Sequence, residues 1–424
     1  MDPRTAELHV MTAGADDLAA LLKAHPQQKA QDRNKDDVDA EPVVRRLYTS
    51  RIGLRALGVP SPVPCILSSR WPSLVEVDLS GNLLQTLPSG LGSLRCLRKL
   101  YLQYNKLSAL PADLCAYGSG IDLRELWVDH NELTELPRDW SGAQQLVSFH
   151  CAWNRLTSLP ASLVKSRPRL TELLCQNNEL RSLPACLGPG LPALRCLALR
   201  ANHLTELPAS LGDAPSLVRL LAGSNPLGTS GGIPFALGLC PMSELYLAAC
   251  ELRVLPEALQ LYGSTLRWID ISDNMLETLP GWVEELHALQ WIDADHNRFA
   301  TFQQGVARRL AQLVGLSLAG NPIEKQLGLD GLDPKATTRA MRQIDWESQP
   351  CSRVHEHGPL SRSWASLAAE QMWLEWRAWR ICCGRARIWV DRTQMVHVPM
   401  PRSAFVFLCC MVVAGPLGLL LVFM

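Results

Sequence analysis

The sequence predicts an α/β solenoid, a horseshoe-shaped stack of repeats in which each repeat places one short parallel strand on the concave face. The pattern L-x-x-L-x-L-x-x-N-x-L occurs eleven times in the middle of the 424-residue chain, in steps of 23 to 26 residues. A second pattern, x-x-L-P-x-x-L, follows most copies. Because a repeat of this length cannot cover its own apolar side, neighbouring repeats must stack into one continuous core.

The leucine positions predict the strand. In the repeat LRELWVDHN, Leu126 and Val128 alternate with residues that differ from repeat to repeat. This period of two indicates a short strand with one buried face. Each buried leucine stabilises the fold by about 1.5 to 3 kcal/mol, and several recur in every repeat.

The asparagine of the repeat predicts a structural ladder. After the strand the backbone must turn, and its buried amide and carbonyl groups need partners. An asparagine amide both donates and accepts, so a column of them satisfies adjacent turns. The predicted ladder consists of Asn82, Asn105, Asn131, Asn154, Asn178, Asn202, Asn225, Asn274, Asn297 and Asn321.

The remaining features of the repeat concern its convex side and its irregularities. The L-P-x-x-L segments predict short helical returns that start at proline. Cys250 stands where the eighth repeat should have asparagine, and the seventh repeat has a glycine-rich insertion, so we expect a local flaw or hinge there. A degenerate repeat over residues 47–58 suits an N-terminal cap.

These motifs closely resemble the leucine-rich repeat (LRR) superfamily over about residues 47–325. The L-P-x-x-L form is similar to that of intracellular Ras-group LRR proteins. This resemblance implies a scaffold whose partners include small GTPases or phosphatases. It does not map partner-binding residues onto this chain.

The residues between the inward positions should lie on the concave face, where solenoids usually bind partners. Repeats two to four bring exposed aromatic side chains together there, a composition typical of interface hot spots. The alternative is that these rings only cover one another. The candidate binding residues of this aromatic patch are Tyr101, Tyr104, Trp127, Asp129, His130, His150 and Trp153.

A second group of candidates lies in repeats nine and ten. Carboxylates on neighbouring strands repel one another, so this acidic patch favours a basic partner. The alternative is a solvated face without a partner. The acidic patch comprises Trp268, Asp270, Asp273, Trp291, Asp293, Asp295 and His296.

Composition and motifs argue against several function classes. Forty-one basic residues balance forty-one acidic ones, so no net field favours nucleic acid. The fourteen cysteines form no C-x-x-C pair, and no phosphate loop, zinc-protease, kinase or nucleophile-elbow motif occurs. We therefore expect a monomeric, non-enzymatic protein without cofactor or metal.

The ends of the chain give separate predictions. Residues 1–46 should hold a short helix, or half of an ankyrin-like unit, followed by a polar linker. Residues 326–402 contain a tryptophan- and arginine-rich stretch, 364–390, predicted as a helix at a membrane interface or as a cap on the solenoid. Residues 404–424 carry no charge and would span about 31 Å as a helix, the thickness of a bilayer core.

Together these patterns predict a tail-anchored, cytosol-facing adaptor that binds a protein partner on its concave face. The alternative is a soluble cytoplasmic scaffold in signalling, whose apolar tail packs on the last repeat. The sequence names neither the partner nor the membrane.

Overall fold

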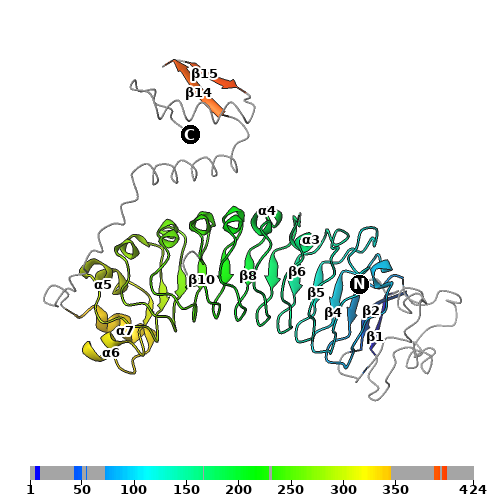
Figure 1. The fold of residues 1–424 in the computed structure, drawn as a ribbon, viewed down its shortest axis with the longest axis horizontal. Coiled ribbons are helices and arrows are strands. Elements are labelled where there is room, and N and C mark those ends of the chain that lie inside the picture. Colours follow the sequence, from blue (N-terminus) through cyan, green and yellow to red (C-terminus); the bar gives the residue numbers. More distant parts are fainter. Residues whose placement is uncertain are drawn as a thin grey trace. The chain divides into compact units, whose positions relative to one another are not determined.

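The computed structural model describes residues 5–9, 43–49, 54, 72–165, 167–228, 232–344, 386–391 and 394–398. The chain forms two compact units, Met1–Ser352 and Arg353–Met424. The first unit contains the repeats (Figure 1).

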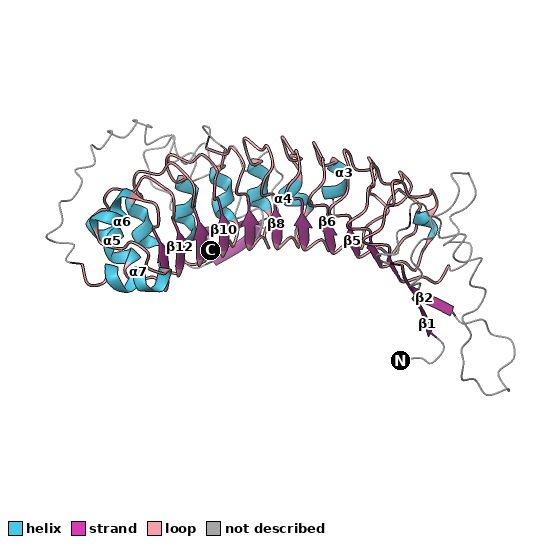
Figure 2. Cartoon of the chain, turned by 90° about the horizontal axis from the view of Figure 1, so that it is seen from below, coloured by secondary structure: helices cyan, strands magenta, loops and turns pink. Residues whose placement is uncertain are grey.

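One parallel sheet of thirteen strands runs through the first unit, with its strands in chain order. Eleven of them, β3 to β13, correspond one to one to the eleven repeats, which confirms the predicted solenoid. The strands line the inner side of the arc and the helical turns lie outside it (Figure 2). They are β3 (Glu76–Asp78), β4 (Lys99–Tyr101), β5 (Glu125–Trp127), β6 (Ser148–His150), β7 (Glu172–Leu174), β8 (Cys196–Ala198), β9 (Arg219–Leu221), β10 (Glu244–Tyr246), β11 (Trp268–Asp270), β12 (Trp291–Asp293) and β13 (Gly315–Ser317).

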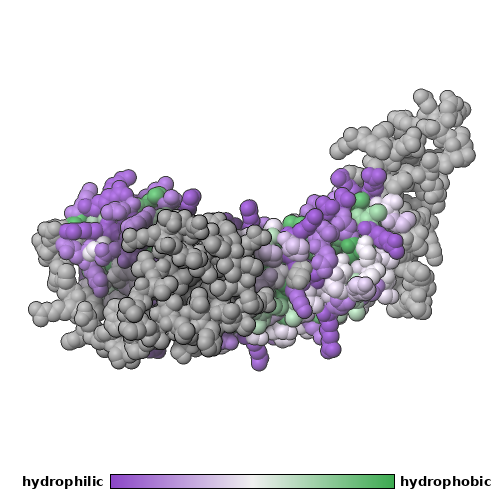
Figure 3. Space-filling model, turned by 90° about the horizontal axis from the view of Figure 1, so that it is seen from above, coloured by the Kyte–Doolittle hydropathy of each residue, from purple (hydrophilic) through white to green (hydrophobic). Residues whose placement is uncertain are grey.

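The core is a single apolar column that extends from Leu47 to Met341. The middle residue of each strand points into it: Leu100, Leu126 and Phe149, for example, are fully buried. The surface seen in Figure 3 is by contrast largely polar where the residues are described. The alternation read from the sequence therefore separates core from surface as predicted.

The asparagine ladder is present and joins adjacent repeats. Asn131 is typical: its amide Nδ2 donates to the carbonyls of Leu102 and Val128, each at 3.0 Å, and its Oδ1 accepts from the Leu107 amide at 3.0 Å. Each asparagine thus satisfies its own turn and that of the preceding repeat. All ten ladder residues are buried, so they are structural.

The L-P-x-x-L segments form short helices or turns, as predicted. The residue before five of these helices is a proline, and a carbonyl such as that of Pro160 accepts from Leu163 three residues later, at 3.0 Å. The helices are η1 (Leu91–Ser93), α3 (Ala161–Val164), α4 (Leu187–Gly190), η2 (Ala209–Asp213), η3 (Phe235–Leu239), η4 (Glu257–Tyr262), η5 (Gly281–Glu285) and α5 (Gln304–Leu310).

The eighth repeat departs from the ladder only locally. The Cys250 thiol lies 3.5 Å from the carbonyl of Ala222, where an asparagine amide would donate. A thiol is a weaker donor and offers no amide oxygen, and the Leu227 amide instead donates to the carbonyl of Asn225 at 2.7 Å. Strands β9, β10 and β11 nevertheless stay paired in continuous register. The predicted flaw is therefore confined to a turn.

The N-terminal prediction of a helix is wrong where the structure can be compared. Residues Thr5–His9 form strand β1, which pairs in parallel with β2 (Val43–Tyr48) and extends the sheet. Ala6 and Leu8 alternate with polar residues, a strand period, and pairing satisfies the free edge of β2. Residues 10–42, which contain the predicted linker, lie outside the described residues.

The solenoid continues beyond residue 325, where the repeat pattern ends. Helices α6 (Pro322–Gln326) and α7 (Pro334–Met341) follow β13, and Leu329 and Met341 are buried in the same core. Arg342 holds the end of α7 in place, because its Nε donates to the carbonyl of Ala311 at 2.6 Å. These helices cover the last repeat.

The second unit contains a hairpin in its described part. Strand β14 (Ala386–Asp391) pairs antiparallel with β15 (Gln394–Val398). The helix predicted over 364–390 is therefore wrong at its end, because Ile388 and Val390 alternate with Arg387 and Trp389 as a strand requires. Residues 345–385 and the apolar segment 404–424 lie outside the described residues. Among the residues that are described, no helix has the length and apolarity to cross a bilayer.

Candidate partner-binding face

Corresponding positions of neighbouring repeats stand side by side on the concave face. The last residue of each strand pairs with the last residue of the next: Tyr101 with Trp127, Trp127 with His150, and Asp270 with Asp293. Strands lie about 4.8 Å apart. The last residues of the strands, from Asp78 to Ser317, therefore form one column in register.

A second column follows the strands and has an unusual backbone. Tyr104, His130, Trp153, Asp273 and His296 all have φ between 52° and 58°, in the left-handed region. This conformation costs an ordinary residue about 1 to 2 kcal/mol relative to glycine. The chain places glycine there only in its first and last repeats, at Gly81 and Gly320. The left-handed turn after each strand therefore directs these bulky side chains outward from the sheet.

The aromatic patch consists of two parallel stacks. In the first, Trp127 lies against Tyr101 and His150, with ring centroids 4.8 Å away on either side. In the second, His130 lies 4.3 Å from Tyr104 and 5.2 Å from Trp153, with nearly parallel planes. The rings do cover one another, yet Tyr104 and Trp153 remain 58% and 53% exposed. These two residues present the apolar surface that a partner could bury.

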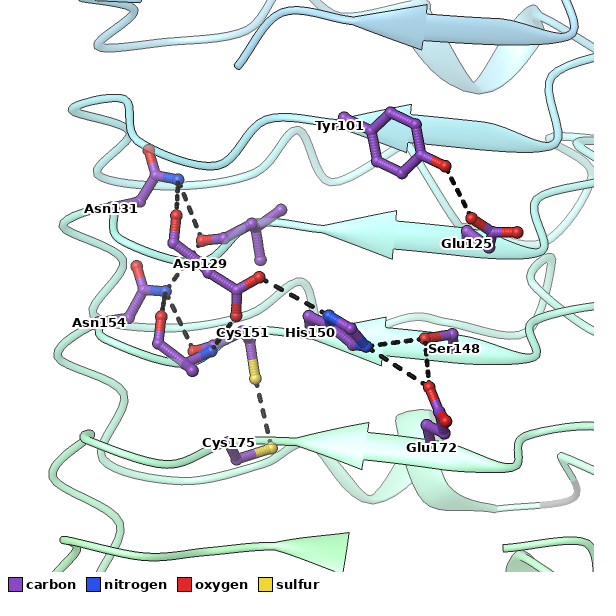
Figure 4. Close-up of polar contacts among 12 residues, drawn as sticks. Tyr101, Glu125, Asp129, Asn131, Ser148, His150, Cys151, Asn154, Glu172 and Cys175 are labelled. Carbon is purple, nitrogen blue, oxygen red and sulfur yellow. Dashed lines mark hydrogen bonds and ion pairs between the residues drawn. The ribbon is translucent and has the colours of Figure 1, made fainter. Parts of the chain in front are cut away.

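Polar contacts hold Tyr101 and His150, the two outer rings of the first stack, as Figure 4 shows. The Tyr101 hydroxyl donates to Glu125 Oε2 at 2.8 Å. His150 Nε2 lies 2.9 Å from Ser148 Oγ, and its Nδ1 lies 3.9 Å from Asp129 Oδ2. The His150 ring thus lies between Ser148 of its own strand and Asp129 of the preceding repeat.

Burial changes the acidity of this patch. Burial raises the pKa of the Asp129 carboxyl. Two neighbours act in the opposite direction and lower it: the Ala152 amide, which donates to Asp129 at 2.8 Å, and His150. Burial and the bond to Glu125 likewise raise the pKa of Tyr101. The Ala152 amide, and after it His150, therefore oppose the effect of burial on the pKa of Asp129.

The residue types Ser148, His150 and Asp129 are those of a nucleophile with its base, so their geometry matters. The Asp129 to His150 distance of 3.9 Å exceeds hydrogen-bond reach, and Ser148 Oγ also lies 3.3 Å from the Glu172 carboxylate. Neighbouring backbone amides, such as those of Cys151 and Ala152, already donate within the protein. This cluster positions His150 and offers no amide for an oxyanion.

The acidic patch is also assembled as predicted, on β11 and β12. Trp268 pairs with Trp291, and their ring centroids lie 5.1 Å apart in a stack. Asp270 and Asp293 follow in register, while Asp273 and His296 are exposed in the left-handed column.

Asp293 is not a freely solvated carboxylate. Burial, together with the charges of Asp295, Asp270 and Asp273, raises its pKa to about 6. Asp293 is thus partly buried among other carboxylates.

Several residues that build the patches were not among the sequence candidates. The first residue of each of three strands contacts the aromatic patch: Glu125, Ser148 and Glu172. The alternation of buried and exposed residues in the sequence could by itself have placed them there. Gly315 was also missed: a Cβ at this position would lie 2.1 Å from the Trp291 indole. In the described part of the chain, no three His, Cys, Asp or Glu side chains come together as a metal site would require.

Two family models of leucine-rich repeats match the chain, one over residues 241–299 and one over 73–94. Solved structures of the same architecture superpose on most of the repeats. These matches support the resemblance to the leucine-rich repeat superfamily that the repeat pattern indicates. No curated protein matches it.

Three solved LRR structures illustrate the similarity. The LRR ectodomain of the receptor kinase GASSHO1/SCHENGEN3 from Arabidopsis thaliana, in complex with CASPARIAN STRIP INTEGRITY FACTOR 2, is 26% identical with a TM-score of 0.53. The match covers 66% of this chain and 33% of that ectodomain. An internalin of Listeria monocytogenes (19% identity, TM-score 0.53, 69% and 85% covered) and the LRR domain of APL1B (22%, 0.51, 66% and 75%) share the fold.

Proposed function

We propose that this protein is a non-enzymatic scaffold that binds a protein partner on the concave face of its LRR solenoid. One observation carries the proposal. Tyr104 and Trp153 are more than half exposed although each occupies a strained left-handed position. Stacking on His130 leaves more than half of each ring exposed, whereas burial of the two rings in an interface gains about 1 to 3 kcal/mol each.

The superfamily supports this proposal in general terms. LRR domains typically act as binding modules, and the Arabidopsis receptor ectodomain was solved with a bound protein factor. Small GTPases and phosphatases are the partner classes to test first, because the L-P-x-x-L repeats resemble those of Ras-group proteins.

A photocrosslinking experiment tests the concave face even while the partner is unidentified. Benzoylphenylalanine replaces Tyr104 in one protein and Tyr117 in another. Tyr117 is 88% exposed but lies in a loop outside the strands, so it is a matched control. We expect a discrete crosslinked species in cells at position 104 alone, lost when Trp153→Ser is added. Equal labelling at both positions contradicts the proposal.

We further propose that residues 404–424 tether this scaffold to a membrane with the repeats in the cytosol. The support is the run of twenty-one uncharged residues, which is long enough to cross a bilayer core. Alkaline carbonate extraction of the full-length chain and of a version ending at Arg402 tests it. A soluble full-length chain would favour the alternative of a cytoplasmic scaffold.

A further inference from the structure

The acidic patch is built from one tripeptide used twice. Strands β11 and β12 both read Trp-Ile-Asp, and they pair tryptophan to tryptophan and aspartate to aspartate. The Trp291 indole lies over Gly315, whose missing side chain leaves room for it. The stack of Trp268 on Trp291 therefore stands in a fixed place beside the two carboxylates.

One oxygen of each neighbouring carboxylate is held by the protein. Asp270 Oδ1 accepts from the Ser272 amide at 3.0 Å, and Asp293 Oδ1 accepts from the Asp295 amide at 3.3 Å. Asp295 Oδ1 accepts from the Ala319 amide at 2.7 Å. Among the described residues no hydrogen bond or ion pair involves the Oδ2 atoms of these three aspartates, and Arg or Lys pairs with none of them. The carboxylates are thus oriented but not neutralised.

The aromatic patch shows what the protein does with the same geometry elsewhere. Asp129 occupies the position in repeat three that Asp295 occupies in repeat ten, and each accepts from the backbone amide of the next repeat. In the first case the next strand supplies His150 beside the carboxylate. In the second the next strand has Ser317 at that register. The next strand thus supplies an imidazole at one site and a serine at the other.

We propose that the acidic patch binds an arginine side chain in a basic segment of the partner protein. The guanidinium would lie beside the Trp268–Trp291 stack and pair with Asp270, Asp293 and Asp295. A planar guanidinium suits both contacts, because it stacks on indoles and binds carboxylates through two donors, whereas a lysine ammonium does not. This inference rests on the proposed function of the concave face and specifies the chemistry of the partner.

Peptide binding to the full-length protein tests this chemistry. The probe is a fluorescein-labelled glycine–serine peptide with spaced arginines, compared by anisotropy with peptides that carry lysine or neutral, isosteric citrulline instead. We expect the arginine peptide to bind at least about tenfold more tightly than the citrulline peptide. We also expect its affinity to fall with added salt.

Three variants assign the binding to the patch. Asp270→Asn with Asp293→Asn should weaken arginine-peptide binding about tenfold or more. The control, Glu277→Gln with Glu285→Gln, makes the same charge change on nearby exposed residues that lie outside the strands. Ser317→Arg, in a third variant, would place a cation beside Asp295 and should also block the peptide.

Several outcomes overturn the inference. These are equal binding of arginine and citrulline peptides, equal loss in the control variant, or unchanged binding to a folded Ser317→Arg protein. Crosslinking at position 104 is a separate readout. If a partner crosslinks at position 104 although the arginine and citrulline peptides bind alike, that result supports the concave face as the binding surface and contradicts only the arginine assignment.

Discussion

The aromatic and acidic patches share one backbone geometry but differ in how their charges are compensated. At the aromatic patch, the buried carboxylate of Asp129 has an imidazole from the next strand beside it. At the acidic patch, Asp293 has further carboxylates around it, and its pKa is raised to about 6. The first patch offers exposed apolar area, whereas the second offers carboxylates that pair with no Arg or Lys among the described residues. A repeat scaffold can thus carry two different binding chemistries without any change of fold.

The largest expected effect tests whether the two patches share the same support. Asn131→Ala beneath the aromatic patch and Asn297→Ala beneath the acidic patch should each lower the free energy of unfolding by about 2 to 3 kcal/mol, because buried backbone groups lose their partners. Urea denaturation measures both. His203→Ala, at an exposed site beside the ladder, is the control. A cost below about 0.5 kcal/mol at either asparagine would show that the supports differ.

The next effect concerns the space over Gly315 that the Trp291 indole occupies. Gly315→Ala places a methyl group 2.1 Å from that ring, and we expect a loss of about 1 to 2 kcal/mol as the stack on Trp268 is displaced. In a Trp291→Ala background the same substitution should cost almost nothing. The double-mutant cycle in urea gives the coupling between the two sites. An additive result would mean that the ring does not lie over Gly315 in solution.

A smaller effect concerns the pH dependence of stability at the acidic patch. The pKa of Asp293 is raised above the unfolded value of about 3.9, so the folded state binds more protons than the unfolded state between about pH 4 and 6. Stability from this group is present at low pH and is lost as pH rises through 6. Asp293→Asn should therefore gain about 1 kcal/mol over the wild type between pH 4.5 and 7.5, after allowance for solvent screening. Glu277→Gln should show no such divergence in the same denaturation series.

The smallest effect addresses the strained column. Trp153→Gly relieves a left-handed backbone but loses a stacking contact with His130, so the two terms, each about 1 kcal/mol, should nearly cancel. Trp153→Ala keeps the strain and should be the less stable variant by about 1 kcal/mol. Thermal unfolding of the two proteins decides the order. The reverse order would show that φ at this position relaxes after substitution.

The sequence predicted the repeats of the solenoid better than the two ends of the chain. Alternating leucines and the asparagine ladder specify the strand, its buried face and its register, because each repeat makes the same contacts with its neighbours. At Thr5–His9 and Ala386–Asp391, single short segments lacked that repetition, and the helix predictions failed there. Helices α6 and α7 were missed for the same reason, since no repeat pattern marks them.

The candidate site divides in the same way. The sequence by itself determined which residues share a column, since the repeat length fixes that Trp127 stands beside His150 and Asp270 beside Asp293. It could not determine that Trp127 lies inside a stack while Tyr104 and Trp153 are exposed, nor that His150 Nδ1 lies 3.9 Å from Asp129. Those properties depend on the φ angle of the left-handed residue in the turn after each strand and on side-chain packing between repeats. Periodicity determines neighbours, and only tertiary structure decides their burial, orientation and charge.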